Sequence, residues 1–142
     1  MLVYLLFLHL VADFFLQSRE MGTKKSSEFY WLLKHIGIQI CIFAFGLMYF
    51  VGPALALQFS LLNALIHGVI DWNIWKLYKY TVYRRLLTRV ISEGAREDQY
   101  EAGIASHAKV WKYYEDSKFY DTIGIDQFLH AATIVLLAGA LL

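Results

Sequence analysis

The chain has 142 residues, of which 58% are hydrophobic and 18% are charged, and its mean hydropathy is +0.45. A soluble domain of this size cannot bury so much apolar surface, which excludes an ordinary soluble globular protein and favours the lipid bilayer as partner. The net charge of +1 gives no sign of a nucleic-acid partner, and none is expected.

Four apolar stretches have about the length that a membrane-spanning helix needs. They cover about residues 2–17, 30–51, 54–75 and 123–142. Together they predict an all-α, integral membrane four-helix bundle that forms one domain over residues 1–142. The first stretch is short and requires a thinned or crowded part of the bilayer. It has neither a basic start nor a small-residue cleavage site, so we expect that it is not removed as a signal peptide.

The connections between these stretches differ in charge. All thirteen Lys and Arg residues lie in or beside the connections 18–29 and 76–122, and neither the Gly52-Pro53 turn nor either terminus carries one. By the positive-inside rule, the two basic connections are cytoplasmic, while both termini and the Gly52-Pro53 turn are outside.

The long insert over residues 76–122 should contain helical structure of its own. The third helix is expected to continue past the membrane surface until Gly94 stops it. After Gly94, apolar and aromatic residues recur at spacings of three and four, which predicts a cytoplasmic amphipathic helix that lies on the membrane surface or caps the bundle. The residues of this face are Tyr100, Ile104, His107, Trp111 and Tyr114.

Each apolar stretch also carries a polar stripe whose members are four residues apart. Four residues are little more than one helical turn, so each stripe lies on one helix face. In the predicted topology all four stripes meet at one depth near the cytoplasmic face, as a single constructed site requires. The stripes are His9, Asp13 and Gln17; His35 and Gln39; Asn63, His67 and Asp71; and Asp126 and His130.

These residue types favour a transition metal. Imidazoles combined with carboxylates suit zinc best, with iron or manganese as alternatives, because a calcium or magnesium site would be mostly oxygen. A metal with an open position lowers the pKa of bound water to about 7, so hydrolysis is the leading chemistry. The expected metal ligands are His9, Asp13, His67, Asp71, Asp126 and His130; Asp13, Asp71 and Asp126 would also share general-base catalysis, and His35, Gln17, Asn63 and Gln127 would support the ligands from outside the coordination shell.

Three motifs carry a family resemblance: His9-x-x-x-Asp13-Phe-x-Leu-Gln17, His67-Gly68-x-Ile70-Asp71 and Asp126-Gln127-x-Leu-His130. In this order they resemble the domain of unknown function 3307 family. The resemblance covers all four predicted helices and leaves residues 84–120 as a variable insert. It implies a small membrane protein of bacteria or their phages, so we expect the bacterial inner membrane. A looser similarity to membrane-embedded zinc hydrolases, such as the alkaline ceramidase group, favours a hydrolase without selecting a substrate.

We therefore expect a membrane-embedded metal-binding protein, and more specifically a metal-dependent hydrolase of a lipid-like or membrane-associated substrate. Two alternatives stay open. The stripes could pass protons or a divalent cation across the bilayer, although the outer parts of the helices are almost wholly apolar, which disfavours a pathway. The chain could also act without catalysis, by binding another membrane protein.

Overall fold

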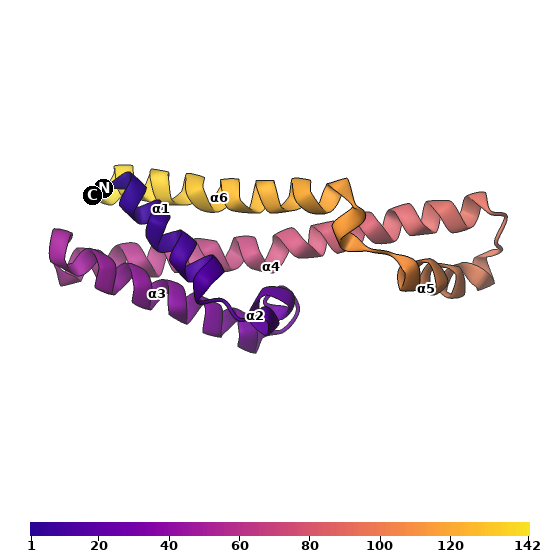
Figure 1. Ribbon diagram of the computed structural model, residues 1–142, viewed down its shortest axis with the longest axis horizontal. Coiled ribbons are helices and arrows are strands. Elements are labelled where there is room, and N and C mark those ends of the chain that lie inside the picture. Colours follow the sequence, from indigo (N-terminus) through magenta and orange to yellow (C-terminus); the bar gives the residue numbers. More distant parts are fainter.

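The computed structural model describes residues 1–142, and 88% of them are helical, so the predicted all-α fold is confirmed. A π-helical turn, Val11–Phe15, follows the first helix, and short 3-10 turns precede and follow the fifth, at Glu97–Gln99 and Tyr113–Glu115. The six α-helices, labelled in Figure 1, are α1 (Leu2–Leu10), α2 (Arg19–Lys24), α3 (Phe29–Val51), α4 (Pro53–Ser92), α5 (Tyr100–Val110) and α6 (Ser117–Leu141).

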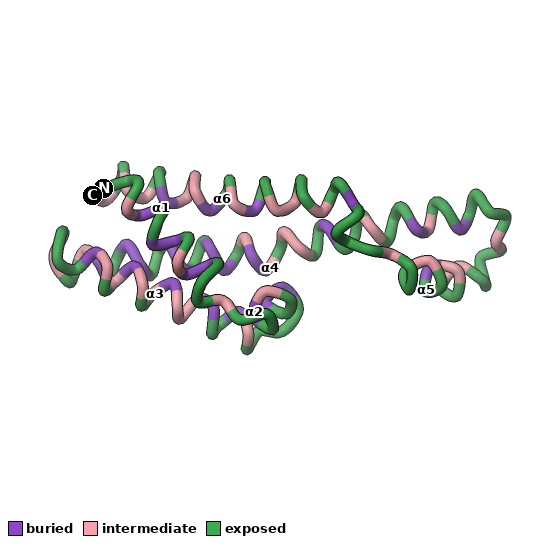
Figure 2. The backbone as a smooth tube through the Cα atoms, viewed as in Figure 1, coloured by how far each residue is buried: buried purple, intermediate pink, exposed green.

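Four helices form what we call the packed body: α1, α3, the first part of α4, and α6. Within it α1 contacts α3 and α6, and α4 contacts the same two helices. In Figure 2 the buried positions recur along these helices on the sides where the helices approach one another, and exposed positions alternate with them on the outer sides. The apolar part of the core consists of Leu5, Leu8, Phe43, Leu47, Ala56, Phe59 and Ile134.

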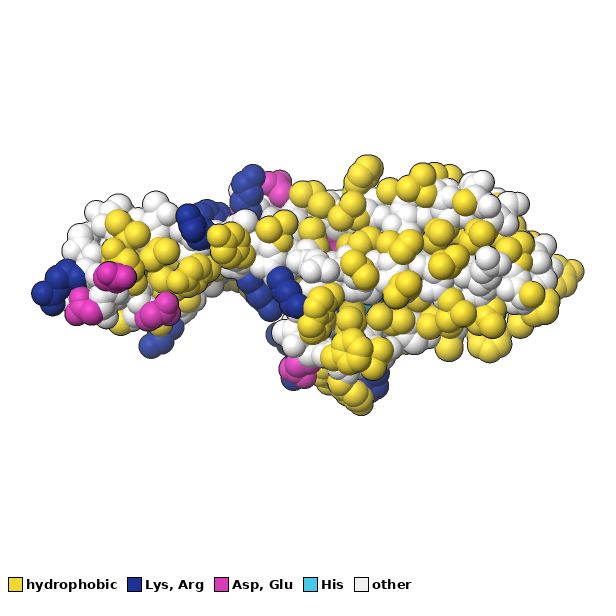
Figure 3. All heavy atoms as spheres, turned by 180° about the vertical axis from the view of Figure 1, so that it is seen from behind, with side chains coloured by type: hydrophobic (Ala, Val, Ile, Leu, Met, Phe, Trp, Pro, Cys, Tyr) yellow, Lys and Arg dark blue, Asp and Glu magenta, His cyan; other side chains and the backbone are white.

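The face of the packed body that Figure 3 shows is also largely apolar. Phe45, Leu65, Phe128 and Leu136 are each well over half exposed. Soluble monomers rarely expose apolar patches of this extent. Three helices, α3, α4 and α6, are long and apolar enough to cross a membrane, and Leu2–Phe15 is a shorter apolar helix. These features are compatible with a membrane protein.

The turn between α3 and α4 follows from two residues. Gly52 has a φ of +81°, which favours glycine, and Pro53 occupies the first turn of α4, where its missing N–H costs nothing. The turn makes α3 and α4 antiparallel. Both chain termini lie at the same end of the packed body as this turn (Figure 1).

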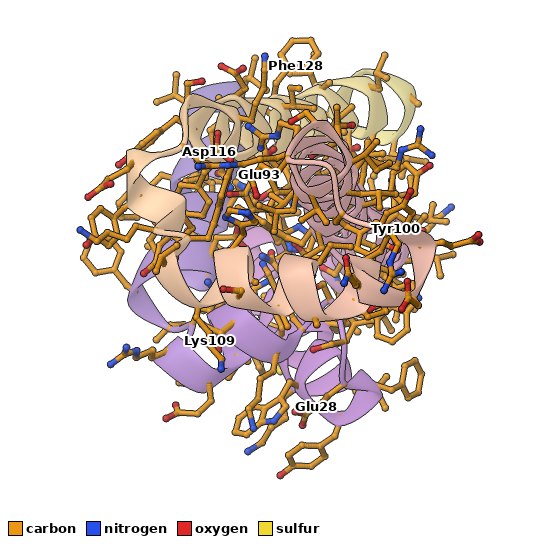
Figure 4. All side chains as sticks on the ribbon, turned by 90° about the vertical axis from the view of Figure 1, so that its right-hand side faces the viewer. Glu28, Glu93, Tyr100, Lys109, Asp116 and Phe128 are labelled. Atoms are coloured by element: carbon orange, nitrogen blue, oxygen red, sulfur yellow. The ribbon has the colours of Figure 1, made fainter.

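Beyond the packed body, α4 continues and forms an arm with α5. Gly94, with a φ of +83°, follows the end of α4, as the sequence predicts. Figures 1 and 4 show α5 crossing the far part of α4, and Ile104 is buried there against Leu86 and Val90. Since α4 is the only α-helix that α5 contacts, the prediction that this helix caps the bundle is wrong. The apolar face is covered by α4 instead, because Gly103 leaves room for Val90.

The predicted face of the insert helix is also shorter than expected. α5 ends at Val110, and Trp111 has extended backbone angles, so Trp111 and Tyr114 do not continue the helix. Asp116 then caps α6 by accepting a hydrogen bond from the Lys118 backbone N–H. This cap starts α6 at Ser117, six residues before the expected start at 123.

Candidate metal centre

The polar stripes of α1, α3, α4 and α6 converge inside the packed body on one buried group of side chains, which we call the polar cluster. Gln39 and Gln127 lie beside it. Each ionisable member is at most 5% exposed. The ionisable members are His9, Asp13, His35, His67, Asp71, Asp126 and His130, together with Lys25 from the connection after α2.

The segment that carries Asp13 has an unusual backbone. Asp13 lies in the π-helical turn that follows α1, where the Leu16 N–H donates to the Val11 carbonyl at 3.0 Å, five residues back. Single π-helical turns are frequent at functional sites. His9 and Asp13 both face the interior, with His9 Nε2 3.8 Å from Asp13 Oδ2. The wider turn thus presents both groups of the first motif to the polar cluster.

Four donor atoms from three segments lie at the centre of the polar cluster. His35 Nε2 is 2.9 Å from His67 Nε2, 2.9 Å from Asp13 Oδ1 and 3.3 Å from Asp71 Oδ2. His67 Nε2 is 3.3 Å from Asp13 Oδ1 and 3.2 Å from Asp71 Oδ2. We call His35, His67, Asp13 and Asp71 the four-donor set.

The spacing within the four-donor set resembles a coordination shell. Zinc bonds to nitrogen and oxygen of about 2.0–2.2 Å place tetrahedral ligand atoms about 3.3–3.6 Å apart. Five of the six separations in the set are known, and they lie between 2.9 and 3.3 Å, slightly shorter than these edges. A neutral imidazole carries only one N–H, so hydrogen bonds alone cannot satisfy every close pair.

His130 extends the polar cluster toward α6. Its ring stacks on His67, with the centroids 3.8 Å apart, and its Nε2 lies 3.5 Å from Asp71 Oδ1 and 3.5 Å from Asp126 Oδ1. Three overlapping groups could therefore hold a metal ion: His9, Asp13 and His67; His35, His67 and Asp71; and Asp71, Asp126 and His130.

Several nitrogen and oxygen atoms of the polar cluster that could bind a metal have no hydrogen-bond partner. They include both ring nitrogens of His9 and Nδ1 of His130, while His130 Nε2 and Asp126 Oδ1 have only contacts of 3.5 Å and no hydrogen bond of good geometry. Nearly all buried polar atoms in proteins are paired, because an unpaired one costs about 1–3 kcal/mol. The unpartnered nitrogens and oxygen are all of types that ligate metals, so the residues present fit a bound metal ion.

The residues expected to support the ligands have different positions. His35 lies in the centre, within the four-donor set, rather than at its edge. Gln127 lies between two carboxylates, and its Nε2 donates to Asp13 Oδ2 at 3.4 Å and to Asp126 Oδ2 at 3.3 Å. Gln39, for which the sequence predicts only a place on the stripe of its helix, donates to Asp13 Oδ1 at 2.9 Å.

Two other polar residues and one histidine contribute less. Asn63 is buried, but its Nδ2 has no partner. Gln17 packs against Gly22 of α2, outside the polar cluster. His107 lies in the arm, where its Nε2 is 2.9 Å from Glu93 Oε2 and lowers the pKa of that carboxyl by hydrogen bonding. His107 therefore lies outside the polar cluster.

Lys25 is a member of the polar cluster that the sequence pattern does not indicate. Its Nζ lies 2.8 Å from Asp71 Oδ1 and 3.4 Å from His35 Nε2. The sequence places this lysine only in the basic connection that sets topology, and its neighbour Lys24 does point outward, 3.3 Å from Glu28. The available signal was charge: three carboxylates on apolar helices need a compensating cation.

These observations define an all-α protein with membrane-compatible helices and a buried cluster of metal-ligating residue types. The chain belongs to the family described as protein of unknown function (DUF3307), whose profile matches residues 1–142. The resemblance drawn from the sequence motifs is thereby confirmed at the level of the family. Comparison with curated proteins and with solved structures gives no match.

Proposed function

We propose that this chain is a membrane-embedded metal protein, and that its metal activates water to hydrolyse an ester, amide or phosphoester bond of a lipid-like substrate. The observation that supports it most is the four-donor set, whose spacing suits one tetrahedral ion. Two imidazoles with two carboxylates fit zinc best, and iron or manganese next.

In this proposal α1, α3, α4 and α6 form a four-helix bundle in the bacterial inner membrane. The apolar outward surface supports insertion. The basic residues of the arm and of the connection after α1 support a cytoplasmic position for both, with the termini and the Gly52-Pro53 turn outside. The polar cluster then lies within the bilayer, where unpaired ionisable groups are costly and mark function.

The roles within the polar cluster follow from the distances. His35, His67, Asp13 and Asp71 would hold the ion, and a zinc ion can expand to five ligands, which leaves a position for water. Asp126 is the one carboxylate of the polar cluster outside the four-donor set, and its Oδ1 has only a long contact, of 3.5 Å, with His130 Nε2. Asp126 is therefore our candidate for the general base.

The remaining core disfavours the transport alternative. Toward the termini, the helices pack through apolar side chains such as Leu5, Phe43, Phe59 and Ile134, all of them at most 1% exposed. A proton or cation pathway needs polar groups or water on both sides of the site. The core cluster here is made of apolar side chains, and the hydroxyl of Ser60 beside it donates to the Ala56 carbonyl at 2.6 Å, which supports hydrolysis over conduction.

Metal content tests the proposal. Full-length protein purified in detergent without chelators should carry near-stoichiometric metal. Asp71→Asn keeps the size of the side chain but removes the negative charge, and His67→Ala removes a donor nitrogen, so each should lower metal affinity by about 10- to 100-fold or more. Elemental mass spectrometry of the purified proteins measures this.

His107→Ala is the matched control, because His107 binds Glu93 in the arm and should leave metal content unchanged. Chelation should abolish hydrolysis of a long-chain p-nitrophenyl ester or phosphoester in mixed micelles, and zinc should restore it. Wild-type protein without any transition metal would refute the metal centre, and full activity after chelation would refute metal-dependent hydrolysis.

A further inference from the structure

Lys25 is the only Lys or Arg within the polar cluster. Its side chain is 5% exposed, and it pairs with the fully buried carboxylate of Asp71. Taking an ammonium group out of water is costly, and a carboxylate partner offsets part of that cost. The buried ammonium of Lys25 therefore forms part of the charge balance of the polar cluster.

The two carboxylate oxygens of Asp71 face different neighbours. Oδ2 lies 3.3 Å from His35 Nε2 and 3.2 Å from His67 Nε2, as part of the four-donor set. Oδ1 lies 2.8 Å from Lys25 Nζ and 3.5 Å from His130 Nε2. A carboxylate can bridge two metal ions by binding one through each oxygen. Here the Lys25 ammonium pairs with Oδ1, so only Oδ2 is left for a metal ion.

The formal charge of the polar cluster points to the same arrangement. With neutral imidazoles, the form that binds metal, three carboxylates and one ammonium sum to −2. One divalent ion neutralises this charge. Two divalent ions would leave a net charge of +2, or of +1 with a bridging hydroxide. A net charge in this buried environment is costly. Without the ammonium, two divalent ions and one hydroxide would be neutral.

We propose that Lys25 takes the place of a second metal ion, so that the centre holds one ion and Asp71 binds it through Oδ2 alone. This inference rests on the proposed metal centre but not on hydrolysis. Lys25 is then a residue that determines how many ions bind. A variant without the Lys25 ammonium would bind a second divalent cation, held by Asp71 Oδ1, Asp126 and His130.

Metal stoichiometry tests this inference. Full-length protein in detergent is stripped with a chelator, dialysed against excess Zn²⁺ and then analysed for zinc per chain. Wild type and Lys25→Arg, which keeps the positive charge, should each saturate at one ion. Lys25→Met, which keeps much of the volume without the charge, should saturate at two. Loading with Co²⁺ gives a second measurement, because two bridged ions couple magnetically and a single ion does not.

The outcomes separate this inference from the proposed function. No metal in wild type refutes the metal centre and this inference with it. One ion in wild type and in folded Lys25→Met refutes only the role of Lys25. Two ions, or a magnetically coupled cobalt pair, in wild type also refute that role while the metal centre stands. If Lys25→Met loses its helical circular dichroism, zinc per chain is measured in Lys25→Gln instead. The cobalt spectrum of wild type then gives the second measurement of whether one ion or two are bound.

Discussion

At the scale of single residues, the three buried aspartates have different surroundings. Asp13 and Asp71 belong to the four-donor set, whereas Asp126 meets only His130, at 3.5 Å, and Gln127, at 3.3 Å. In the proposed function, these different surroundings assign separate roles to identical side chains. A ligand stabilises the bound ion, while a general base acts on the water that the ion activates.

Asp126→Asn should separate these roles. We expect the variant to keep its metal, because the four-donor set is intact, and to lose about 10²- to 10⁴-fold in the rate of ester hydrolysis, since an amide cannot accept the proton. Initial rates in mixed micelles, with metal content measured on the same samples, check both parts. Asp121→Asn, on the exposed side of α6 beside Lys118, is the control and should change neither quantity. A loss of metal comparable with that of Asp71→Asn would make Asp126 a ligand instead.

At the scale of the helices, Asp116 joins the arm to α6. Arg85 of α4 donates to both of its oxygens, at 3.1 and 2.6 Å, and Tyr78 donates to Oδ2 at 3.0 Å. The Lys118 backbone N–H donates to Oδ1 at 3.1 Å, which caps α6. The hydrogen bonds from the Arg85 guanidinium lower the pKa of Asp116 below its ordinary value. One carboxylate thus fixes both the start of α6 and its contact with α4.

The sign of the pH dependence follows from that lowered pKa. A carboxyl with a lower pKa in the folded state stabilises the fold above its ordinary pKa of about 3.9, and this stabilisation is lost as the pH falls through the lowered value. Asp116→Ala should therefore cost about 1–2 kcal/mol at pH 7 and reduce the loss of stability in acid. Thermal unfolding followed by circular dichroism at pH 7 and at pH 3 measures both effects.

The control for the arm is Asp98→Ala, because Asp98 is exposed and lies 3.6 Å from an equally exposed Arg96. A surface pair of this kind contributes little, so the midpoint of unfolding should stay near that of wild type at both pH values. Equal destabilisation by Asp98→Ala and Asp116→Ala would contradict the assigned role of Asp116.

In the molecule as a whole, the basic residues and the chain termini lie toward opposite ends of the long axis. The termini and the Gly52-Pro53 turn lie at one end of the packed body, and the arm extends from the other (Figure 1). The Lys and Arg residues gather on the arm and beside its junction with the packed body (Figure 3). A membrane placed around the apolar surface therefore separates the two ends.

Topology reporters test that orientation. Reporters fused after Leu142 and inserted at the Gly52-Pro53 turn should report outside, and one inserted near Glu97 should report the cytoplasm, because basic residues are retained on the cytoplasmic side. Opposite locations for the first two reporters would contradict the antiparallel arrangement of α3, α4 and α6. A complete inversion of all three would contradict only the orientation inferred from charge.

The features that depend on local geometry could be predicted from the sequence. The apolar stretches of helix length predicted an all-α fold, Gly52-Pro53 and Gly94 predicted a turn and a helix end, and the family resemblance followed from three motifs. Spacing by four also placed His67 and Asp71 on one face of α4. These predictions succeed because helix periodicity and the preferences of glycine and proline act over a few residues.

The contacts between side chains from distant segments depend on the tertiary structure and could not be predicted from the sequence. It brings His35 to the centre of the polar cluster, turns Lys25 inward while Lys24 points outward, and packs α5 on α4 by way of Ile104. Each of these outcomes depends on the path of a connection and on contacts between distant segments. Neighbouring residues in a connection have no fixed periodicity, so only the packing of the surrounding helices selects which of two adjacent lysines is buried.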